Sequence, residues 1–154
     1  MRMPHLSRAR PSGTRRLMAD LRAIDLFSEC SRTELGRIAA LTTEHSARPG
    51  QVLVRQGEPG EEFFVIIEGR AAVIRNDSYL AVRGPGSFVG ELALLDRGKR
   101  SASVVAETKM RLLVMSVREF NSLRHVAPSV SHKMLLELGS SLRRSDAMLD
   151  GLFH

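Results

Sequence analysis

Hydrophobic residues are spaced in two different ways along the chain, and the first spacing is helical. Over residues 21–41 they recur every three or four positions, as on one face of an amphipathic helix. Ser31 or Thr33 is suited to cap the start of this helix, with Glu34 in its first turn. The residues of the apolar face are Leu35, Ile38, Ala39 and Leu41.

After a turn at Pro49–Gly50, the pattern changes to short runs rich in Val, Ile, Leu and Phe. Glycines, the pair Asn76–Asp77 and the pair Thr108–Lys109 are predicted turns that separate these runs at intervals of about 8 to 12 residues, which is typical of an antiparallel sandwich or barrel. The runs cover residues 51–57, 61–69, 70–77, 78–84, 101–108 and 110–116.

Beyond Ser116, a predicted N-cap, the helical pattern returns. One helix is predicted over 117–127, ending before Pro128, and a longer one over about 129–152. Leucines at alternating spacings of three and four form a heptad seam in the longer helix, with Ser145 as its one polar member. The seam either pairs two copies of the chain or packs on the chain's own sheet. Its leucines are Leu135, Leu138, Leu142, Leu149 and Leu152.

These patterns predict a fold that is mainly β with flanking α. We expect an antiparallel, jelly-roll-like β-roll over about 43–116, with a helical segment before it and two helices over about 117–152 after it. A length of 154 residues suits one domain, here 18–154, and 43% hydrophobic against 26% charged residues is ordinary for a globular chain. No apolar run approaches the roughly 18 residues of a membrane span. The single cysteine, Cys30, fits a reducing compartment, so we expect a cytoplasmic protein.

The net charge of +6 is concentrated in residues 1–17, which hold five arginines and no acid and leave 18 basic against 17 acidic residues in the rest. Rich in Pro, Ser and Gly, this segment is predicted to be a basic, disordered tail. Three explanations stay open: a solvated leader or upstream start preceding Met18, an arm that contacts nucleic acid or anionic lipid, and a transit peptide.

The stretch GELALLDRGKRSASV, residues 90–104, combines groups suited to a sugar phosphate. Gly90 allows close backbone approach, and the apolar residues after Glu91 predict a short helical turn whose first amides favour an anion. Arg100 can grip a phosphate with two N–H groups, and the carboxylate of Glu91 would accept a ribose hydroxyl. The plain structural alternative is a Glu91–Arg100 ion pair around a β-corner.

The segment FVGELALLDRGKRSAS closely resembles the phosphate-binding cassette of the cyclic nucleotide-binding domain family. RQGEPGEEFFVIIEGRAAV, residues 55–73, resembles the family's glycine-pinned strand pair, and LFSECSRTEL resembles its opening helix. The resemblance covers roughly residues 21–149. It implies a short cassette helix and a regulatory, non-enzymatic domain that takes a cyclic nucleotide as ligand and needs no further cofactor.

The resemblance also implies individual roles. The backbone around Gly90, Leu92 and Ala93 would meet the cyclic phosphate, Glu91 the ribose 2′-hydroxyl, and Arg100 the phosphate charge. Ser101 would add a hydroxyl contact to the phosphate. The predicted purine contacts are Val82, Val89, Ser145 and Asp146.

Two departures from the family's bacterial catabolite activators qualify the function. Asp146 differs from the hydroxyl residue expected at the base contact. The DNA-binding domain of those activators has no counterpart before His154, so we expect no sequence-specific DNA binding and an output to an unknown partner protein. We expect cAMP as ligand rather than cGMP, although a hydroxyl at Ser101 could assist guanine.

Two other function classes remain as alternatives. The first is a dimerisation or interaction module that keeps the fold without binding nucleotide. The second is a metal-dependent enzyme on a similar β-roll. The five histidines show no clustered spacing suited to a metal site, and no nucleophile motif is present, so we expect neither a metal site nor catalysis.

Overall fold

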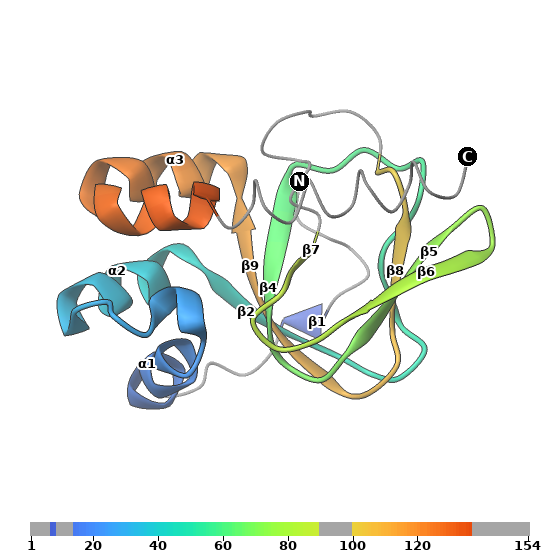
Figure 1. The fold of residues 1–154 in the computed structure, drawn as a ribbon, viewed down its shortest axis with the longest axis horizontal. Coiled ribbons are helices and arrows are strands. Elements are labelled where there is room, and N and C mark those ends of the chain that lie inside the picture. The colour runs from blue at the N-terminus through green and yellow to red at the C-terminus, as the bar shows by residue number, and fades with distance from the viewer. Residues whose placement is uncertain (1–6, 9–13, 90–99, 137–154) are drawn as a thin grey trace.

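The computed structural model describes residues 7–8, 14–89 and 100–136. Figure 1 shows a β-roll beside a layer of helices, and all strand pairings are antiparallel. One sheet has the order β1 (Ser7–Arg8), β2 (Thr43–Ala47), β9 (Met110–Ser116), β4 (Glu62–Glu68), β7 (Phe88–Val89). The other has the order β3 (Val52–Val54), β8 (Ser103–Ala106), β5 (Ala71–Arg75), β6 (Ser78–Arg83). The predicted fold class, mainly β with flanking α, is confirmed.

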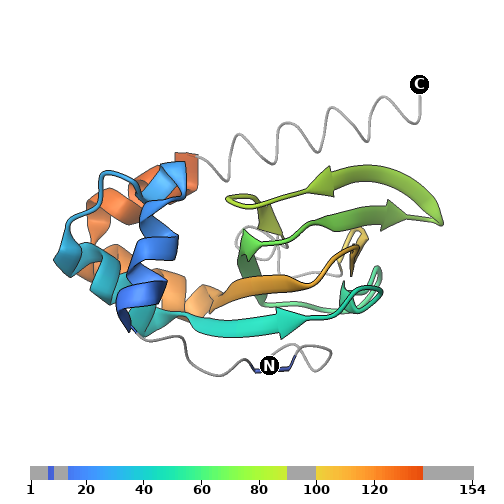
Figure 2. The same ribbon diagram turned by 90° about the horizontal axis from the view of Figure 1, so that it is seen from below.

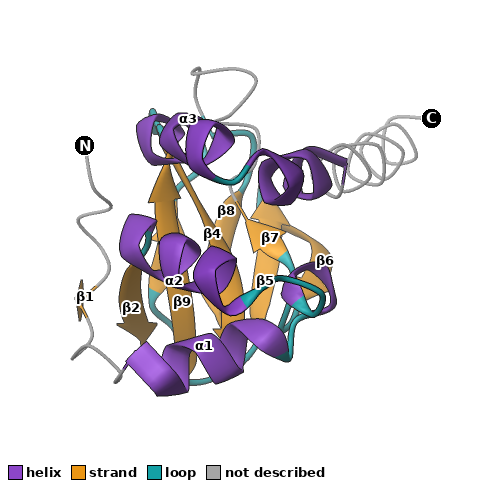
Figure 3. Cartoon of the chain, turned by 90° about the vertical axis from the view of Figure 1, so that its left-hand side faces the viewer, coloured by secondary structure: helices purple, strands orange, loops and turns teal. Residues whose placement is uncertain are grey.

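The helices lie against the outer face of the five-stranded sheet (Figure 3). They are α1 (Thr14–Arg22), the short 3-10 helix η1 (Asp25–Phe27), α2 (Arg32–Leu41) and α3 (Val117–Val126), followed by helical residues 128–136. The view from below in Figure 2 separates this helical layer from the two sheets of the roll.

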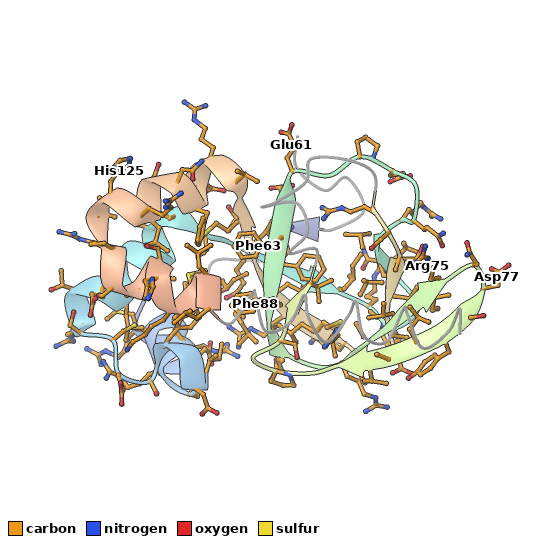
Figure 4. The ribbon with its side chains drawn as sticks, turned by 45° about the horizontal axis from the view of Figure 1, so that its top comes forward. Glu61, Phe63, Arg75, Asp77, Phe88 and His125 are labelled. Carbon is orange, nitrogen blue, oxygen red and sulfur yellow. The ribbon has the colours of Figure 1, made fainter. Side chains whose placement is uncertain are left out.

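Strand β4, which lies between β9 and β7, is buried on both faces, which explains its unbroken apolar run. Phe63 and Val65 point to the helical layer, whereas Phe64 and Ile66 point into the roll, because successive side chains alternate across a strand. The ring centroids of Phe63 and Phe88 lie 6.1 Å apart, in the core between the sheet and the helices (Figure 4). One strand thus joins two cores, one beneath the helices and one inside the roll.

The hairpin between β5 and β6 turns at Asn76 and Asp77. Both residues have positive φ, 49° and 64°, and Arg75 pairs with Ser78 across the turn. Two left-handed residues in a two-residue loop match the right-handed twist of the flanking strands. The predicted Asn–Asp turn is therefore confirmed.

The predicted N-caps of two helices are both found. Ser31 caps α2 and Ser116 caps α3, each in a reciprocal capping box with the glutamate three residues later. The predicted cap at Ser31, rather than the alternative Thr33, is thus the one observed. The helix predicted over 117–127 corresponds to α3. Of the helix predicted from about 129 to 152, residues up to 136 are helical and the rest lies outside the described residues.

The helical pattern over residues 21–41 corresponds to more than one helix: the end of α1, the 3-10 helix η1, and α2 with its N-cap at Ser31. The chain leaves the α-helix after Arg22 and makes a series of tighter turns, in which the amide of Ile24 bonds Leu21, that of Phe27 bonds Ile24, and that of Cys30 bonds Phe27. All four of these side chains are buried. A spacing of three keeps a side chain on one side of a 3-10 turn, whereas on an α-helix the same stripe would drift around the axis.

Two pieces of the segment 1–17, which was expected to be a tail, form secondary structure. Ser7–Arg8 pairs with Ser46 and His45 of β2, and residues 14–17 belong to α1. Leu17 and Met18 pack against the core beneath the helices, so burial of this apolar face draws α1 into the fold. The folded part begins before residue 18.

Candidate functional site

Strand β4 holds both ends of the predicted phosphate-binding segment. At one end, Val89 of β7 pairs with Phe64. At the other end, Arg100 donates from Nη2 to the backbone carbonyl of Glu62, at 2.7 Å. Because Glu62 and Phe64 are two residues apart on one strand, Val89 and the guanidinium of Arg100 lie near the same end of β4. Gly90, Glu91, Leu92 and Ala93 themselves lie outside the described residues.

Arg100 is fixed through its backbone as well as its side chain. Its N–H donates to the carbonyl of Glu58 at 2.8 Å, and its carbonyl accepts from the N–H of Gly57 at 2.9 Å. Together with the Glu62 contact, these bonds tie Arg100 to both sides of the loop that precedes β4. A guanidinium held in this way is suited to bind a carboxylate or phosphate in a defined orientation.

Glu62 is a buried acidic residue next to the guanidinium of Arg100. It begins β4 and is only 2% exposed. By the alternation along the strand it lies on the same face as Phe64 and Ile66, which form the core of the roll. The site therefore combines a half-buried cation with a carboxylate at the end of the roll's interior.

The loop beside Arg100 is also tied to the β5–β6 hairpin. The side-chain amide of Gln56 pairs reciprocally with Asn76: its Nε2 donates to Oδ1 at 2.8 Å and its Oε1 accepts from the backbone N–H at 2.9 Å. The N–H of Gln56 donates to Ser103 Oγ at 2.9 Å. Figure 4 shows the neighbouring Arg75 and Asp77 at the hairpin's outer end. The loop therefore links the hairpin, β8 and Arg100.

Two of the predicted purine contacts, Val82 and Val89, differ in their exposure to solvent. Val89 is 3% exposed and belongs to the core inside the roll, whereas Val82 on β6 is 46% exposed and pairs with Ala72. Ser101 is half-buried next to Arg100. Ser145 and Asp146 lie outside the described residues, so the base contact stays a prediction.

Glu62 and Gly60 were not assigned from the sequence to the site around Arg100. Glu62 supplies the carbonyl for Arg100, and Gly60 lies directly beneath the guanidinium. The only signal in the sequence was the stretch GEPGEE before an apolar strand, from which Gly60 was expected only to serve a corner. The pairing with Arg100 depends on residues about 40 positions apart and is not visible in the local pattern.

Within the parts of the chain that the structure describes, no helix is long and apolar enough to cross a membrane. In the same residues, no group of three or more His, Cys, Asp or Glu side chains is arranged to hold a metal ion.

Comparison with known proteins decides the family. The sequence model of the cyclic nucleotide-binding domain matches residues 44–125, more than half of the 154 residues. The chain belongs to the cyclic nucleotide-binding domain family. The match begins in β2 and ends in α3, so it includes the whole stretch of β4, Arg100 and the loop that holds it.

Individual relatives agree with this assignment. This cyclic nucleotide-binding domain is 33% identical over 106 residues to the cyclic AMP receptor protein of Thermus thermophilus, an alignment that covers 66% of this chain and 49% of that protein. It therefore spans about half the length of this curated relative. Its fold matches the crystal structure of a cyclic nucleotide-binding domain from Methylobacillus flagellatus, with TM-score 0.77, 25% identity and coverage of 97% of this chain and 89% of that one. The catabolite activator protein of T. thermophilus matches with TM-score 0.71 and 30% identity, covering 82% and 62%.

Proposed function

We propose that this domain is a regulatory sensor that binds a cyclic nucleotide through residues 89–101, with cAMP as the favoured ligand. The observation that carries the proposal is the placement of Arg100: three hydrogen bonds to residues 57–62 hold it at the point where the predicted cassette returns to the sheet. A fixed cation there meets the main requirement for binding a cyclic phosphate, because the charged group is oriented before the ligand arrives.

The remaining contacts follow the predicted cassette. Backbone amides around Gly90, Leu92 and Ala93 bind the phosphate together with Arg100. Glu91 accepts the ribose 2′-hydroxyl, since a carboxylate has only acceptor atoms to offer. Ser101 adds a hydroxyl contact.

The purine lies toward Val82 and Val89, with Ser145 and Asp146 approaching from the C-terminal helix. The partial exposure of Val82 supports this, since apolar surface at the wall of a site is available to a base. The cAMP preference rests on the relative named for cyclic AMP. It also rests on the family resemblance, because bacterial cAMP binders of the family carry a serine at the position of Ser101. cGMP is the competing ligand, and its exocyclic amino group would use the Ser101 hydroxyl.

The output passes through the C-terminal helix to a partner protein in the cytoplasm. The domain contributes binding and not catalysis. A ligand can shift the helix only through contacts that differ between two arrangements, and Ser145 and Asp146 provide such contacts if they close over the base.

Titration calorimetry with cAMP and cGMP tests the function, and Arg100→Ala tests the site. Loss of one partner of a desolvated charge pair costs roughly 2 to 5 kcal/mol, so the affinity should fall about 30-fold to several-thousand-fold. Arg48→Ala, an exposed arginine in the β2–β3 turn, is the control and should bind as the wild type does. Equal affinity of the Arg100→Ala and wild-type proteins would remove residues 89–101 from the site.

A second variant separates the ribose from the phosphate. Glu91→Ala should weaken cAMP binding and leave the affinity for 2′-deoxy-cAMP nearly unchanged. If the wild-type protein bound neither cAMP nor cGMP, the alternative would hold: an interaction module that retains the fold without the ligand.

A further inference from the structure

Gly60 occupies a position where the guanidinium of Arg100 leaves no room for a side chain. A Cβ built on Gly60 would overlap the Nε, Cζ and Nη2 atoms of Arg100. The backbone of Gly60 is not in the left-handed region, so no turn geometry requires glycine here. The reason for a glycine at this position is therefore the space that Arg100 fills.

The atoms that overlap are the far end of a flexible side chain and not backbone. An alanine at position 60 can therefore be accommodated if the guanidinium moves away, while the chain around it keeps its path. The glycines with backbone reasons differ: Gly69, for example, has a φ of +90° and lies against the carbonyl of Lys109. Gly69 is therefore required by the backbone conformation, whereas Gly60 is required only by the side chain of Arg100.

The groups on either side of Gly60 hold the same arginine. The N–H of Gly57 and the carbonyl of Glu58 bond the backbone of Arg100, and the carbonyl of Glu62 accepts from Nη2. Residues 57–62 thus form a seat: polar backbone groups at both ends and, between them, a glycine on which the planar guanidinium rests. The guanidinium thus lies in close contact with the backbone of Gly60.

We propose that Gly60 is a positioning residue for the phosphate-binding arginine. By leaving the seat open, it lets Arg100 adopt its binding orientation before a ligand arrives. Arginine has one of the largest side-chain entropies, and ordering it before binding removes that cost from the association step. This inference rests on the proposed function, because it assigns Arg100 the cyclic phosphate as its ligand.

The decisive experiment is a double-mutant cycle titrated with cAMP on the full chain. Gly60→Ala should lower the affinity by roughly tenfold or more, because a displaced guanidinium loses much of the charge-pair energy that truncation removes. Arg100→Ala removes every atom with which a methyl group at position 60 would overlap. In the Arg100→Ala background, Gly60→Ala should therefore change the already reduced affinity by less than about twofold, within the usual limit of additivity error.

Gly36→Ala in α2 is the matched control, because a Cβ there meets nothing within 4 Å. It should leave the affinity unchanged. Wild-type affinity for Gly60→Ala would overturn the proposal. So would an equal loss of affinity in the wild-type and Arg100→Ala backgrounds, since that result would mean the loop itself had been distorted.

A measurement without nucleotide keeps this test separate from the proposed function. The side-chain Nε–H resonance of Arg100, assigned by its loss in Arg100→Lys, should be resolved and slow to exchange in the wild-type domain. Gly60→Ala should shift it or speed its exchange. A wild-type protein that binds neither nucleotide would refute the proposed function alone, whereas an unchanged resonance in Gly60→Ala would refute the seat.

Discussion

At the scale of single residues, Glu34 joins two distant parts of the chain. Its Oε1 accepts from the N–H of Ser31 at 2.9 Å, which closes the capping box of α2. Its Oε2 accepts from the hydroxyl of Ser129 at 3.1 Å, in the helical residues 128–136. The hydrogen bond from the Ser31 backbone, followed by that from Ser129, lowers the pKa of Glu34 below its ordinary value. The charged carboxylate is therefore favoured in the folded state.

This shift predicts a pH dependence of stability. Because the folded-state pKa lies below the unfolded one of about 4.3, the stabilisation is complete above the unfolded value and is lost as the pH falls through the folded value. We expect Glu34→Gln to unfold more easily than wild type at pH 7, and the two unfolding free energies to converge as the pH is lowered from 5. Urea titrations at several pH values measure this difference.

Ser129→Ala serves as the partial control for this prediction. It removes the donor to Oε2 and leaves the capping box intact, so its loss of stability should be smaller than that of Glu34→Gln. A constant difference between Glu34→Gln and wild type from pH 7 to pH 3 would contradict the role of the charge.

Residue-scale features were predictable where their cause is local. Ser116, and Ser31 with Thr33 as its alternative, were predicted as caps because a hydroxyl at a helix start accepts from the free amides of the first turn, and the structure adds the glutamate that completes each capping box. The function of Gly60 was not predictable, because its reason is the side chain of Arg100, which reaches it only in the folded chain. Local sequence patterns reflect residues that are close in the sequence, and they do not report contacts that form only when the β-roll folds.

At the scale of elements, α1 is fastened to the sheet by an ion-pair cluster. Arg111 of β9 donates from Nη2 to Asp20 of α1 at 2.8 Å and to Glu44 of β2 at 3.0 Å. Burial by itself would lower the pKa of Arg111, but the hydrogen bonds to Asp20 and Glu44 more than offset it, and the pKa is raised. The arginine side chain is 11% exposed, so this pair is far better shielded than a surface ion pair.

Removal of this arginine should loosen α1 in particular. Arg111→Ala leaves two carboxylates without their shared cation, and we expect a loss of roughly 2 to 3 kcal/mol, below the 3 to 5 of a fully buried pair. Hydrogen exchange should become faster in the amides of α1, while those of β4 are affected only through global stability. Arg70→Ala is the control: its pair with Glu107 spans 3.8 Å, and the arginine is 60% exposed. Equal exchange of α1 in the wild-type and Arg111→Ala proteins would show that apolar packing alone holds the helix.

Element boundaries were predictable where apolar periodicity was strong. The runs that became β4, β5, β8 and β9 stood out because they are rich in apolar and β-branched residues. β2 has the polar sequence TEHSA and β7 has only two residues, so neither produced a signal, and both are strands because β9 and β4 supply their partners. The break after Arg22 was missed since a three-residue spacing also occurs in α-helices.

At the scale of the whole molecule, the helix after α3 changes its surroundings along its length. Val130 and Met134 are buried against the other helices, whereas Leu135 is 38% and Leu136 62% exposed. Leu135 is the first residue of the predicted leucine seam, and its exposure in a single chain supports the use of the seam by a second copy. The later seam residues, Leu138, Leu142, Leu149 and Leu152, lie outside the described residues, so the homodimer stays a prediction.

Two leucines side by side offer a matched test of this dimer. Leu135→Asp places a charge in the seam, and Leu136→Asp places the same charge about 100° around the helix, outside it. Sedimentation of the wild-type chain should show a dimer, which Leu135→Asp and Leu142→Asp disrupt and Leu136→Asp affects much less. A wild-type chain that remains monomeric at high concentration, with and without cAMP, would leave the stripe as packing within one chain.

The dimer and the nucleotide site should also be coupled, because Ser145 is both the polar member of the seam and a predicted contact of the base. If cAMP strengthens the dimer tenfold, thermodynamic reciprocity requires the dimer to bind cAMP more favourably by the same coupling free energy, about 1.4 kcal/mol. The monomeric Leu142→Asp variant should therefore bind cAMP with altered affinity, although it leaves the seat of Arg100 untouched. Titration of wild type and Leu142→Asp, each at a concentration where sedimentation has fixed its state, measures the coupling. Identical affinities for monomer and dimer would separate the helix seam from the nucleotide site.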